Sequence, residues 1–280
     1  MTISIIGLGL IGGSMAIEFR KKNFVNHLIG VDESKLHAQT ALNLGLVDEI
    51  MKLQEAVEKA DLVILAIPAN ACLSLLPKVL DITNHQIITD VCSTKEDICN
   101  RVKNHSKREN FVAAHPMAGT EHSGPWAAMP GLFDAKAVIL SDTEDSKPKA
   151  LEIVRKMYDA LNMNIIYMSS HNQDVHAAYV SHISHISSFA LALTVLEKEK
   201  NEKNIFNLAS GGFDSTVRLA KSSAEMWVPI FDQNAENVSQ VLDAYIEQLQ
   251  QFKEIINNHD QEQMTNMINS ANRIKKVLKG

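Results

Sequence analysis

The chain has 280 residues, of which 45% are apolar and 21% are charged, and its formal net charge at pH 7 is −6. This composition is typical of a globular protein with a sizeable core, and the length suits two domains of ordinary size. The excess of acidic residues disfavours a surface for nucleic acid or for an anionic membrane, so we expect neither as a partner.

The three cysteines, Cys72, Cys92 and Cys99, form no C-x-x-C pair. An odd number of cysteines without metal-like spacing is typical of the reducing cytosol. The apolar run at the N-terminus is interrupted at Gly7 and has no Lys or Arg before it, so we expect neither a signal peptide nor a membrane span there. These features together predict a cytoplasmic protein.

A glycine motif follows the first predicted strand. The β-branched run Thr2–Ile6 predicts a buried parallel strand, and residues 13–20 begin a helix. Between them lies G-x-G-x-x-G, in which the first glycine allows a tight turn, the second lets a pyrophosphate approach, and the third lets helix and strand pack closely. The helix N-terminus offers N–H groups to phosphates. We predict that this motif binds a dinucleotide through Gly7, Gly9, Leu10, Ile11 and Gly12.

The second predicted strand, His27–Val31, ends in Asp32, which stands twenty residues after Gly12. A carboxylate at this strand end can accept hydrogen bonds from the ribose 2′-hydroxyl and would repel a 2′-phosphate, so the cofactor is predicted to be NAD rather than NADP. The alternative is a glycine-rich turn with a surface Asp, which would require the whole spacing of the motif to arise by accident.

Strands and helices alternate as far as residue 168. We expect further strands at residues 61–68, 86–90, 111–114, 136–140 and 164–168, and helices at residues 35–44, 70–80, 95–102 and 147–161. This alternation predicts an α/β fold with a Rossmann-type, doubly wound and mostly parallel sheet.

The pattern changes after residue 168, where no further strand is predicted. Helical spacing is found at residues 175–198, 238–257 and 264–278. We therefore expect two domains: residues 1–168 as an NAD-binding Rossmann domain and residues 169–280 as an all-α domain for substrate binding and dimerisation. Long apolar stripes often pack against a second subunit, so a homodimer is expected; the alternative is that they pack within one chain.

The segment Ala114–Gly124 is a dense polar loop at the end of a predicted strand, where open α/β folds place their ligands. A nicotinamide enzyme that oxidises an alcohol needs a base for the hydroxyl proton, and histidine suits this task near neutral pH. His115 is the best-placed candidate, because Pro116 stiffens it and Gly119 permits a ligand to approach. His122 in the same loop is a weaker candidate.

Ser93 follows the predicted strand 86–90. It could hydrogen-bond the cofactor or a catalytic ring, or it could cap the helix that begins near Lys95, and the two roles can coexist. Cys92 has no matched base beside it, so we expect it to have no part in the chemistry.

In the helical region, Ser181–His185 places two imidazoles three residues apart on one helix face. They could form a polar patch towards a cleft between the domains, an interior pair, or a metal site; no third ligand stands at a fixed spacing, so we expect no metal. Arg218 could grip a carboxylate through two parallel hydrogen bonds, or it could belong to a solvated face or a structural ion pair. Trp227 could form a wall for a ring-shaped substrate.

The chain resembles the prephenate/arogenate dehydrogenase family over nearly its whole length. The resemblance rests on six stretches: residues 7–14, 90–95, 115–124, 181–185, 211–218 and 225–227. It implies a Rossmann domain followed by a helical dimerisation domain. It also implies the conversion of prephenate and NAD to 4-hydroxyphenylpyruvate, CO2 and NADH, which supplies a precursor of tyrosine.

The same resemblance implies roles for individual residues. His115 would hydrogen-bond the ring hydroxyl and act as the base, and Ser93 would position His115 and the nicotinamide. Arg218 would bind a substrate carboxylate. The remaining residues implied to face, gate or support the substrate site are His185, Ser181, Glu121 and Trp227.

Two positions depart from the family pattern. Ser215 stands where an Asp is usual, which leaves Asp214 as a possible substitute in the ion-pair network of Arg218. Ser184 stands where the family often has Pro. Neither change removes a proposed catalytic group.

Three rival functions remain open at the level of sequence. Arogenate dehydrogenase differs only in an amino group in place of the keto group of the substrate side chain. Another two-domain hydroxyacid dehydrogenase would need a lysine base, for which Lys221 is the one nearby candidate. A non-catalytic NAD(H) sensor would not need His115, Ser93 and Arg218 together. The sequence does not decide the strictness for NAD, inhibition by tyrosine, or the oligomeric state beyond the expected dimer.

Overall fold

The structure, a computed structural model, describes residues 1–200, 202 and 204–277. The chain forms two compact units, Met1–Ala235 and the remainder from Glu236 onwards, and each is described by itself. The first unit therefore contains the whole sheet together with the first helices that follow it. The expected functional boundary between residues 168 and 169 is a separate question and stays a prediction.

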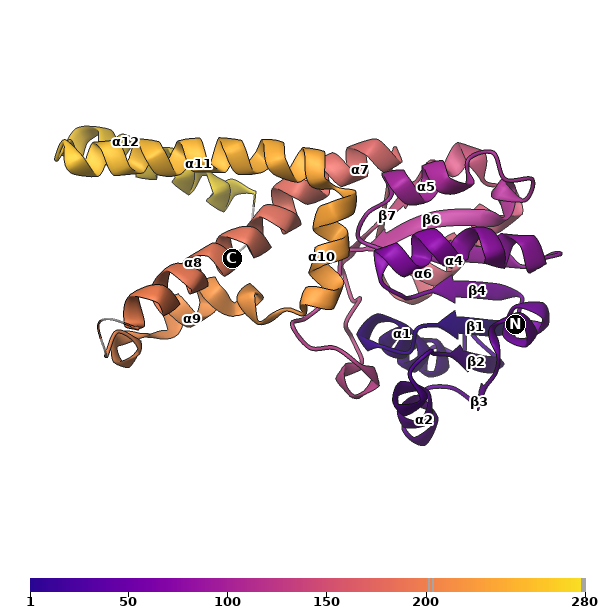
Figure 1. Ribbon diagram of the computed structural model, residues 1–280. Coiled ribbons are helices and arrows are strands. Elements are labelled where there is room, and N and C mark those ends of the chain that lie inside the picture. The colour runs from indigo at the N-terminus through magenta and orange to yellow at the C-terminus, as the bar shows by residue number, and fades with distance from the viewer. Residues whose placement is uncertain (201, 203, 278–280) are drawn as a thin grey trace. The chain divides into compact units, whose positions relative to one another are not determined.

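A single mostly parallel sheet of eight strands forms the centre of the first unit, in the order β3-β2-β1-β4-β5-β6-β7-β8 (Figure 1). All neighbouring strands are parallel except β6 and β7. The strands are β1 (Thr2–Ile6), β2 (His27–Val31), β3 (Glu49–Ile50), β4 (Leu62–Leu65), β5 (Ile87–Asp90), β6 (Phe111–Pro116), β7 (Ala137–Ser141) and β8 (Asn164–Met168). The predicted Rossmann-type sheet is confirmed, while β3 was not predicted because two residues carry no recognisable period.

Six helices pack against this sheet: α1 (Leu10–Lys21), α2 (Lys35–Asn43), α3 (Leu53–Lys59), α4 (Ala69–Ile82), α5 (Glu96–Val102) and α6 (Pro148–Ala160). Helix α1 begins at Leu10, three residues before the predicted start, and α3 was not predicted. The short 3₁₀ turns between elements are η1 (Arg108–Asn110), η2 (Pro125–Ala127) and η3 (Thr143–Asp145).

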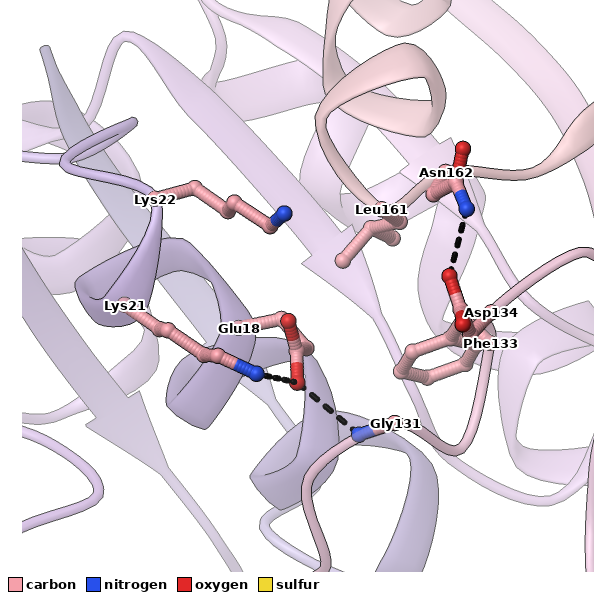
Figure 2. Close-up of a pocket in the computed structure, with 8 residues that line it drawn as sticks. All are labelled: Glu18, Lys21, Lys22, Gly131, Phe133, Asp134, Leu161 and Asn162. Atoms are coloured by element: carbon pink, nitrogen blue, oxygen red, sulfur yellow. Dashed lines mark hydrogen bonds and ion pairs between the residues drawn. The ribbon is translucent and has the colours of Figure 1, made fainter.

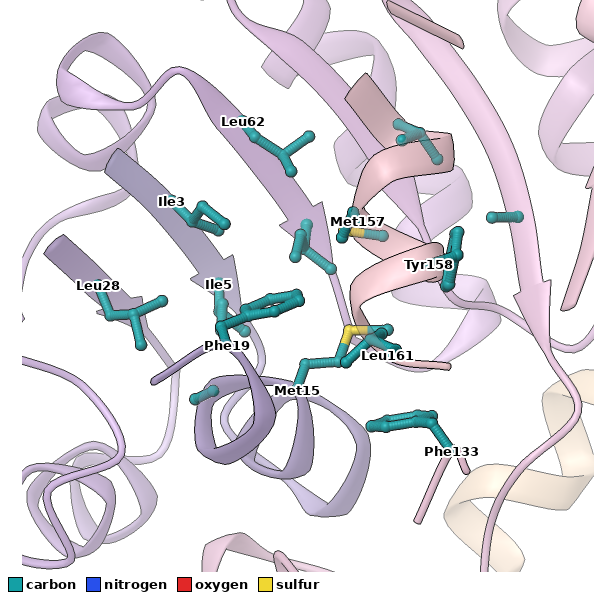
Figure 3. Packing of buried hydrophobic residues seen from close by; sticks show 14 of the residues in the cluster. Ile3, Ile5, Met15, Phe19, Leu28, Leu62, Phe133, Met157, Tyr158 and Leu161 are labelled. Atoms are coloured by element: carbon teal, nitrogen blue, oxygen red, sulfur yellow. The ribbon is translucent and has the colours of Figure 1, made fainter. Parts of the chain in front are cut away.

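Two cores lie on opposite faces of the sheet, because successive side chains of a strand point to opposite sides. Ile3 and Ile5 of β1 pack with Phe19 of α1 and Tyr158 of α6 in one core (Figure 3). Ile6 faces the other core, where side chains of α3, α4 and α5 cover the sheet. The strands are buried on both faces, which explains why they read as continuous apolar runs.

A continuous helical segment follows β8. It consists of α7 (Ser170–Ala177), a π-helical turn η4 (Ala178–His182) and α8 (Ile183–Glu199). The Ser169 hydroxyl caps its start by accepting a hydrogen bond from the Asn172 amide, with a distance of 3.1 Å. The segment starts earlier than the predicted 175, and the remaining elements of this unit are η5 (Phe206–Leu208), α9 (Gly211–Val217), η6 (Arg218–Lys221) and α10 (Ala224–Gln233).

The segment Ser170–Glu199 is also the one described helix that is long and apolar enough to cross a membrane, judged by length and composition alone. Only 11% of its most apolar window is buried. Most of its apolar side chains are therefore not covered by the rest of the described chain.

The second unit is helical, as predicted. It contains α11 (Ala235–Asn257) and α12 (Gln261–Ala271), followed by the 3₁₀ turn η7 (Asn272–Lys276). The predicted helix over residues 264–278 is thus divided, and Leu278 lies outside the described residues. Helix α11 leaves several apolar side chains exposed, namely Tyr245, Ile246, Leu249 and Ile256.

Candidate active site

The glycine loop between β1 and α1 has the geometry that the motif predicts. Gly7 has φ +96°, and a Cβ built on it would lie 2.2 Å from the carbonyl oxygen of Ala66. A Cβ on Gly12 would lie 2.1 Å from the carbonyl oxygen of Gly7, whereas a Cβ on Gly9 would meet no atom within 4 Å. The first and third glycines are therefore required by packing, and the second leaves an open face of backbone for a ligand.

The N-terminus of α1 opens onto the same face. Its N-cap residue, Gly9, has no side chain to satisfy the first turn. In the described part of the chain, the amides of Leu10, Ile11 and Gly12 have no hydrogen-bond partner. Free amides and the positive end of the helix dipole are suited to the pyrophosphate of a dinucleotide, so these residues fit NAD.

Asp32 lies beside this loop at the end of β2. Its Oδ2 accepts a hydrogen bond from the Leu8 amide and its Oδ1 accepts one from the Ser34 amide, both at 2.9 Å. These two contacts fix the carboxylate while each oxygen retains a lone pair. Its side chain is 11% exposed, so the carboxylate is positioned to accept from a ribose hydroxyl and to repel a phosphate.

The loop after β6 runs over the start of α1. The Met129 amide donates to the Ser14 hydroxyl at 3.0 Å, and the Trp126 ring meets the His37 ring of α2 edge-on, with centroids 5.3 Å apart. A hollow of about 590 Å³ is open here, and it is lined by Glu121, His122, Ser123, Trp126, Ala127, Ala128 and Met129. This loop therefore borders the nucleotide-binding edge of the sheet.

A second, smaller hollow of about 180 Å³ lies at the opposite end of α1 (Figure 2). There the Glu18 carboxylate accepts a hydrogen bond from the Gly131 amide at 2.9 Å and lies 3.8 Å from the Lys21 ammonium. None of the predicted site residues lines this hollow, and it lies away from the carboxyl ends of the parallel strands. We therefore place the functional site at the glycine-loop end of the sheet.

His115 is the penultimate residue of β6 and is 7% exposed. Its Nδ1 lies 2.7 Å from the side-chain oxygen of Gln173, a residue of α7. Burial, and next the positive charge of Lys95, lower the pKa of His115 to about 3. The imidazole is therefore neutral at physiological pH, as a general base must be before it accepts a proton.

Gln173 and Asp174 were not predicted as site residues. The Asp174 carboxylate accepts hydrogen bonds from the amides of Lys95 at 2.7 Å and Glu96 at 2.9 Å, and so it caps α5 from a distant helix. The alternative role of Ser93 as the cap of α5 is therefore wrong. The only sequence signal was two polar residues just before a helical pattern, which is too common to single them out.

Ser93 lies in the loop between β5 and α5, half-buried, and its carbonyl oxygen accepts a hydrogen bond from Nε2 of Gln173 at 3.2 Å. Ser93 and His115 thus share one partner, Gln173. The role of the Ser93 hydroxyl towards His115 and the nicotinamide stays a prediction.

A buried ion pair lies under this loop. The Lys95 ammonium donates to the Asp90 carboxylate, which also accepts from the amides of Ala114 and Cys92, each at 3.0 Å. Burial opposes the charged form of Lys95, but the neighbouring Asp90 raises the pKa of Lys95 above its ordinary value. This pair joins the strand that carries His115 to the loop that carries Ser93.

Three possible metal ligands, Cys72, Asp90 and Cys92, are buried with their ligand atoms within 4.8 Å of one another. The Lys95 ammonium already provides the positive charge that Asp90 needs there. A hydrogen bond with Cys92, and next burial, raise the pKa of the Cys72 thiol well above its ordinary value, so this thiol is protonated. This cluster is therefore a structural part of the core.

Arg218 lies at the start of η6, and its side chain is 50% exposed. Its Nη1 lies 3.0 Å from Oε2 of Glu121, in the loop after β6. Asp214 pairs instead with Lys221, also at 3.0 Å. The suggestion that Asp214 substitutes in the ion-pair network of Arg218 is thus wrong, because Glu121 takes that place. Its own backbone amide and then Arg218 hold the pKa of Glu121 below its ordinary value.

The two histidines of the helical segment meet Trp227 of α10. The His185 ring stacks on Trp227 with centroids 3.5 Å apart, and His182 meets the same ring edge-on at 5.8 Å. His185 Nδ1 donates to the carbonyl oxygen of half-buried Ser181 at 3.1 Å. Trp227 is itself buried and backs His185, so its predicted role as a wall for a ring-shaped substrate would act through His185 and stays a prediction.

His182 is fully buried, and its Nδ1 lies 3.1 Å from the side-chain nitrogen of Asn234. Burial and the neighbouring His185 lower the pKa of His182 to about 4. The two histidines therefore differ in character: His182 is an interior residue, as one of the alternatives proposed, while His185 is partly exposed.

These residues form one electrostatically connected set. Burial is the main cause that lowers the pKa of His115, of His182 and of His185, and His182, His185 and Arg218, respectively, add a smaller effect. Charges influence one another in this way only over short distances. Asn234 links His182 to the carbonyl oxygen of Asp174, which stands next to Gln173, and Arg218 reaches the loop after His115 through Glu121. That these residues face one substrate stays a prediction.

Comparison with known proteins shows which family the chain belongs to. The family model described as prephenate dehydrogenase, nucleotide-binding domain, matches residues 15–167. The model described as prephenate dehydrogenase, dimerization domain, matches residues 169–270. The prephenate dehydrogenase of Bacillus subtilis is 30% identical over 280 residues, which cover 96% of this chain and 74% of that relative.

Solved structures that are similar over 99% of this chain include the following two. Prephenate dehydrogenase from A. aeolicus, in complex with hydroxyphenyl propionate and NAD+, is 30% identical, with a TM-score of 0.88 and 97% of that chain covered. Arogenate dehydrogenase from Synechocystis is 27% identical, with a TM-score of 0.78 and 99% of that chain covered. From the fold, the site and these matches, the chain belongs to the prephenate dehydrogenase family.

Proposed function

We propose that this chain is an NAD-dependent prephenate dehydrogenase, which converts prephenate and NAD+ to 4-hydroxyphenylpyruvate, CO2 and NADH in tyrosine biosynthesis. The observation that carries the proposal is the placement of His115, which is buried at the carboxyl end of β6 with its Nδ1 held by Gln173. Among the described residues, its Nε2 has no hydrogen-bond partner. It is therefore free to accept a proton from a substrate hydroxyl beside the nucleotide loop. Membership of the family supports the same reaction.

Gly9, the free amides of α1 and Asp32 would hold the dinucleotide. NAD+ supplies the hydride acceptor when it is bound. The Asp32 carboxylate would select NAD+ over NADP+, because a 2′-phosphate beside it would bring two negative charges together. Ser93 would lie between the nicotinamide and His115, which is the position that the resemblance implies for it.

Arg218 would bind a carboxylate of the substrate. One guanidinium nitrogen contacts Glu121, and in the described part of the chain no other side chain takes the remaining nitrogens. The free edge of the guanidinium can form the two parallel hydrogen bonds that suit a carboxylate. Ser181, His185 and Trp227 would complete this side of the site, with Glu121 ordering the loop through its pair with Arg218.

The chemistry balances without a net proton. The C–H bond at the hydroxyl-bearing carbon breaks with loss of hydride, and the hydroxyl proton passes to Nε2 of His115. Loss of CO2 then makes the ring aromatic, and the proton returns to the phenolate oxygen of the product. Aromatisation supplies a large driving force, so the residues mainly orient the reactants and hold one proton.

Arogenate dehydrogenase is the second candidate, because the Synechocystis relative has that activity in its name and is similar over the full length. The site residues described above serve either substrate, since the keto and amino forms share the ring and both carboxylates. The lysine-base alternative has less support, because the Lys221 side chain is 59% exposed and paired with Asp214.

Absorbance of NADH, followed with prephenate or arogenate and with NAD+ or NADP+, tests these assignments. We expect turnover with prephenate and NAD+. The His115→Asn variant should lose roughly 10²-fold to 10⁴-fold in kcat, because the base is absent. No turnover of either substrate would contradict the proposed activity, and a fully active His115→Asn variant would contradict the role of His115.

We also propose a cytoplasmic homodimer, formed through residues 169–280. Support comes from the match to a dimerization domain and from the exposed apolar side chains of the segment Ser170–Glu199. A second copy of the chain would cover them in place of lipid. The three free, buried cysteines suit a reducing compartment.

A further inference from the structure

Gln173 lies where it can decide which nitrogen of His115 carries the proton. A neutral imidazole has one N–H and one lone pair, and only the nitrogen with the lone pair can act as a base. The role of His115 in the proposed function therefore requires more than neutrality. It requires that the proton reside on the nitrogen that points away from the substrate.

The Gln173 amide is fixed in one orientation. Its nitrogen donates to the Ser93 carbonyl oxygen at 3.2 Å and to Oδ1 of Asp174 at 2.7 Å. Both partners are acceptors only, because Asp174 already receives the amides of Lys95 and Glu96. A flipped amide would place its oxygen against two other oxygens, so the nitrogen must occupy this side.

The orientation of Gln173 determines the state of His115. With both N–H groups of the amide used, the Gln173 oxygen is left facing Nδ1 of His115 at 2.7 Å. That oxygen can only accept, so Nδ1 must donate. The proton of a neutral His115 then resides on Nδ1, and Nε2 carries the lone pair.

The surroundings keep Gln173 in place. It is 0% exposed, and Asp174 beside it caps α5 through two backbone amides. Rotation of the Gln173 side chain would leave the half-buried Ser93 carbonyl and a buried carboxylate oxygen of Asp174 each short of a hydrogen bond, which is costly. The cap on α5 and the orientation of His115 are thus parts of one network.

We propose that Gln173 is the positioning residue of the active site, which holds His115 as the Nδ1–H tautomer with Nε2 as the base. This inference rests on the proposed function only in calling Nε2 the base. The tautomer itself follows from the hydrogen bonds and can be measured without substrate.

Long-range 1H–15N correlation spectra of the full-length protein, labelled with 15N-histidine, report which nitrogen of each ring is protonated. The His115→Asn variant identifies the signals of His115 by their disappearance. We expect protonated Nδ1 and unprotonated Nε2 in the unmodified protein. The opposite tautomer would overturn the proposal, whether or not the protein turns over prephenate.

Two substitutions separate the acceptor from the donors of Gln173. Gln173→Met removes both, so the Nδ1–H tautomer should no longer dominate, and kcat should fall at least about tenfold. Gln173→Glu, when protonated on the oxygen that faces Asp174, keeps both an acceptor for Nδ1 and a donor to Asp174, so it should retain the tautomer and more of kcat than Gln173→Met. In both variants the KM for NAD+ should stay within about twofold. A Gln173→Met variant that keeps the tautomer and kcat would overturn the proposal.

Gln233→Met is the matched control. Gln233 also extends a side-chain amide to the loop of Ser93, where its oxygen accepts from the Thr94 hydroxyl at 2.6 Å, but it does not contact His115. We expect this variant to leave the His115 signals and kcat unchanged. An equal loss of kcat in Gln233→Met and Gln173→Met would show that general loosening of the loop, and not the tautomer, is responsible, and would overturn the proposal.

Discussion

At the scale of single residues, the site combines a neutral imidazole, on His115, with a positively charged guanidinium, on Arg218. His115 is neutral because it is buried and because Lys95 lies near it. Arg218 is half exposed and tied to Glu121 across 97 residues of sequence. His115 therefore offers a lone pair, which a substrate hydroxyl needs, and Arg218 offers a cation, which a substrate carboxylate needs.

Removal of the Arg218 side chain should affect binding more than chemistry. We expect Arg218→Ala to raise the KM for prephenate by roughly 10-fold to 100-fold, since a charge-assisted hydrogen bond contributes about 1.5–3 kcal/mol. The change in kcat should be smaller. Steady-state kinetics with Lys221→Ala as the control tests this, because Lys221 carries the same charge but pairs with Asp214. An unchanged KM in Arg218→Ala would contradict the assignment.

The low pKa of His115 predicts a pH dependence of stability. Its pKa is about 3 in the folded protein and about 6.5 when unfolded, so the unfolded state binds a proton more readily between these values. The free energy of unfolding should therefore fall as the pH falls below 6.5. From pH 7 to pH 5, His115 alone should account for about 2 kcal/mol.

Urea unfolding at pH 7 and pH 5, at one protein concentration, measures this loss. In His115→Asn the loss should be smaller by about the same amount, while the contribution of His182, with a pKa of about 4, remains. Equal losses in the two proteins would contradict the assigned pKa.

At the scale of elements, the turn between β1 and α1 shows how far a local pattern reaches. Strand, glycines, helix, second strand and Asp32 were all predicted, because each depends on residues close together in sequence. The first residue of α1 was not predicted correctly. Gly12 and Gly13 are poor helix formers, so the predicted helix began only at Gly13. The structure includes both in α1, and their neighbours leave no room for a Cβ, which explains why glycine stands at these two helical positions.

Gly7 and Gly9 offer a test of this turn with the same substitution. Gly7→Ala should destabilise the fold, because a Cβ would collide with the Ala66 carbonyl and φ is +96°. Gly9→Ala should keep the melting temperature, because its Cβ would enter open space, but it should weaken NAD+ binding. Thermal unfolding and titration with NAD+ measure the two effects. A Gly9→Ala variant with unchanged affinity for NAD+ would place the pyrophosphate elsewhere.

At the scale of the whole molecule, exposed apolar surface on α8 is the feature that a single chain leaves unexplained. Leu193 is 66% exposed, and Leu196 and Val180 along the same helical segment are also exposed. Several large exposed apolar side chains on one helical segment are typical of an interaction surface. A match to a dimerization domain over residues 169–270 supports a second copy of the chain as its cover.

Leu193→Glu should therefore shift the protein from dimer to monomer, since a buried and unpaired charge at the interface is costly. Light scattering coupled to size-exclusion chromatography measures the mass. Leu36→Glu is the matched control, because Leu36 is 65% exposed but lies on α2 beside the sheet. A dimer that persists in Leu193→Glu would contradict this interface, and dissociation of Leu36→Glu would show that the effect is not specific.

The sequence by itself determined the glycine turn between β1 and α1, the mostly parallel sheet and the helical character of the region after residue 168. Each follows from periodicity or from spacing within some twenty residues, which the local backbone enforces. Only the tertiary structure decided the contacts of Gln173 with His115 and of Asp174 with α5, which span 58 and 79 residues. Such contacts depend on how distant elements pack, so no local sequence pattern predicts them. In the proposed function these contacts set which nitrogen of His115 acts as the base.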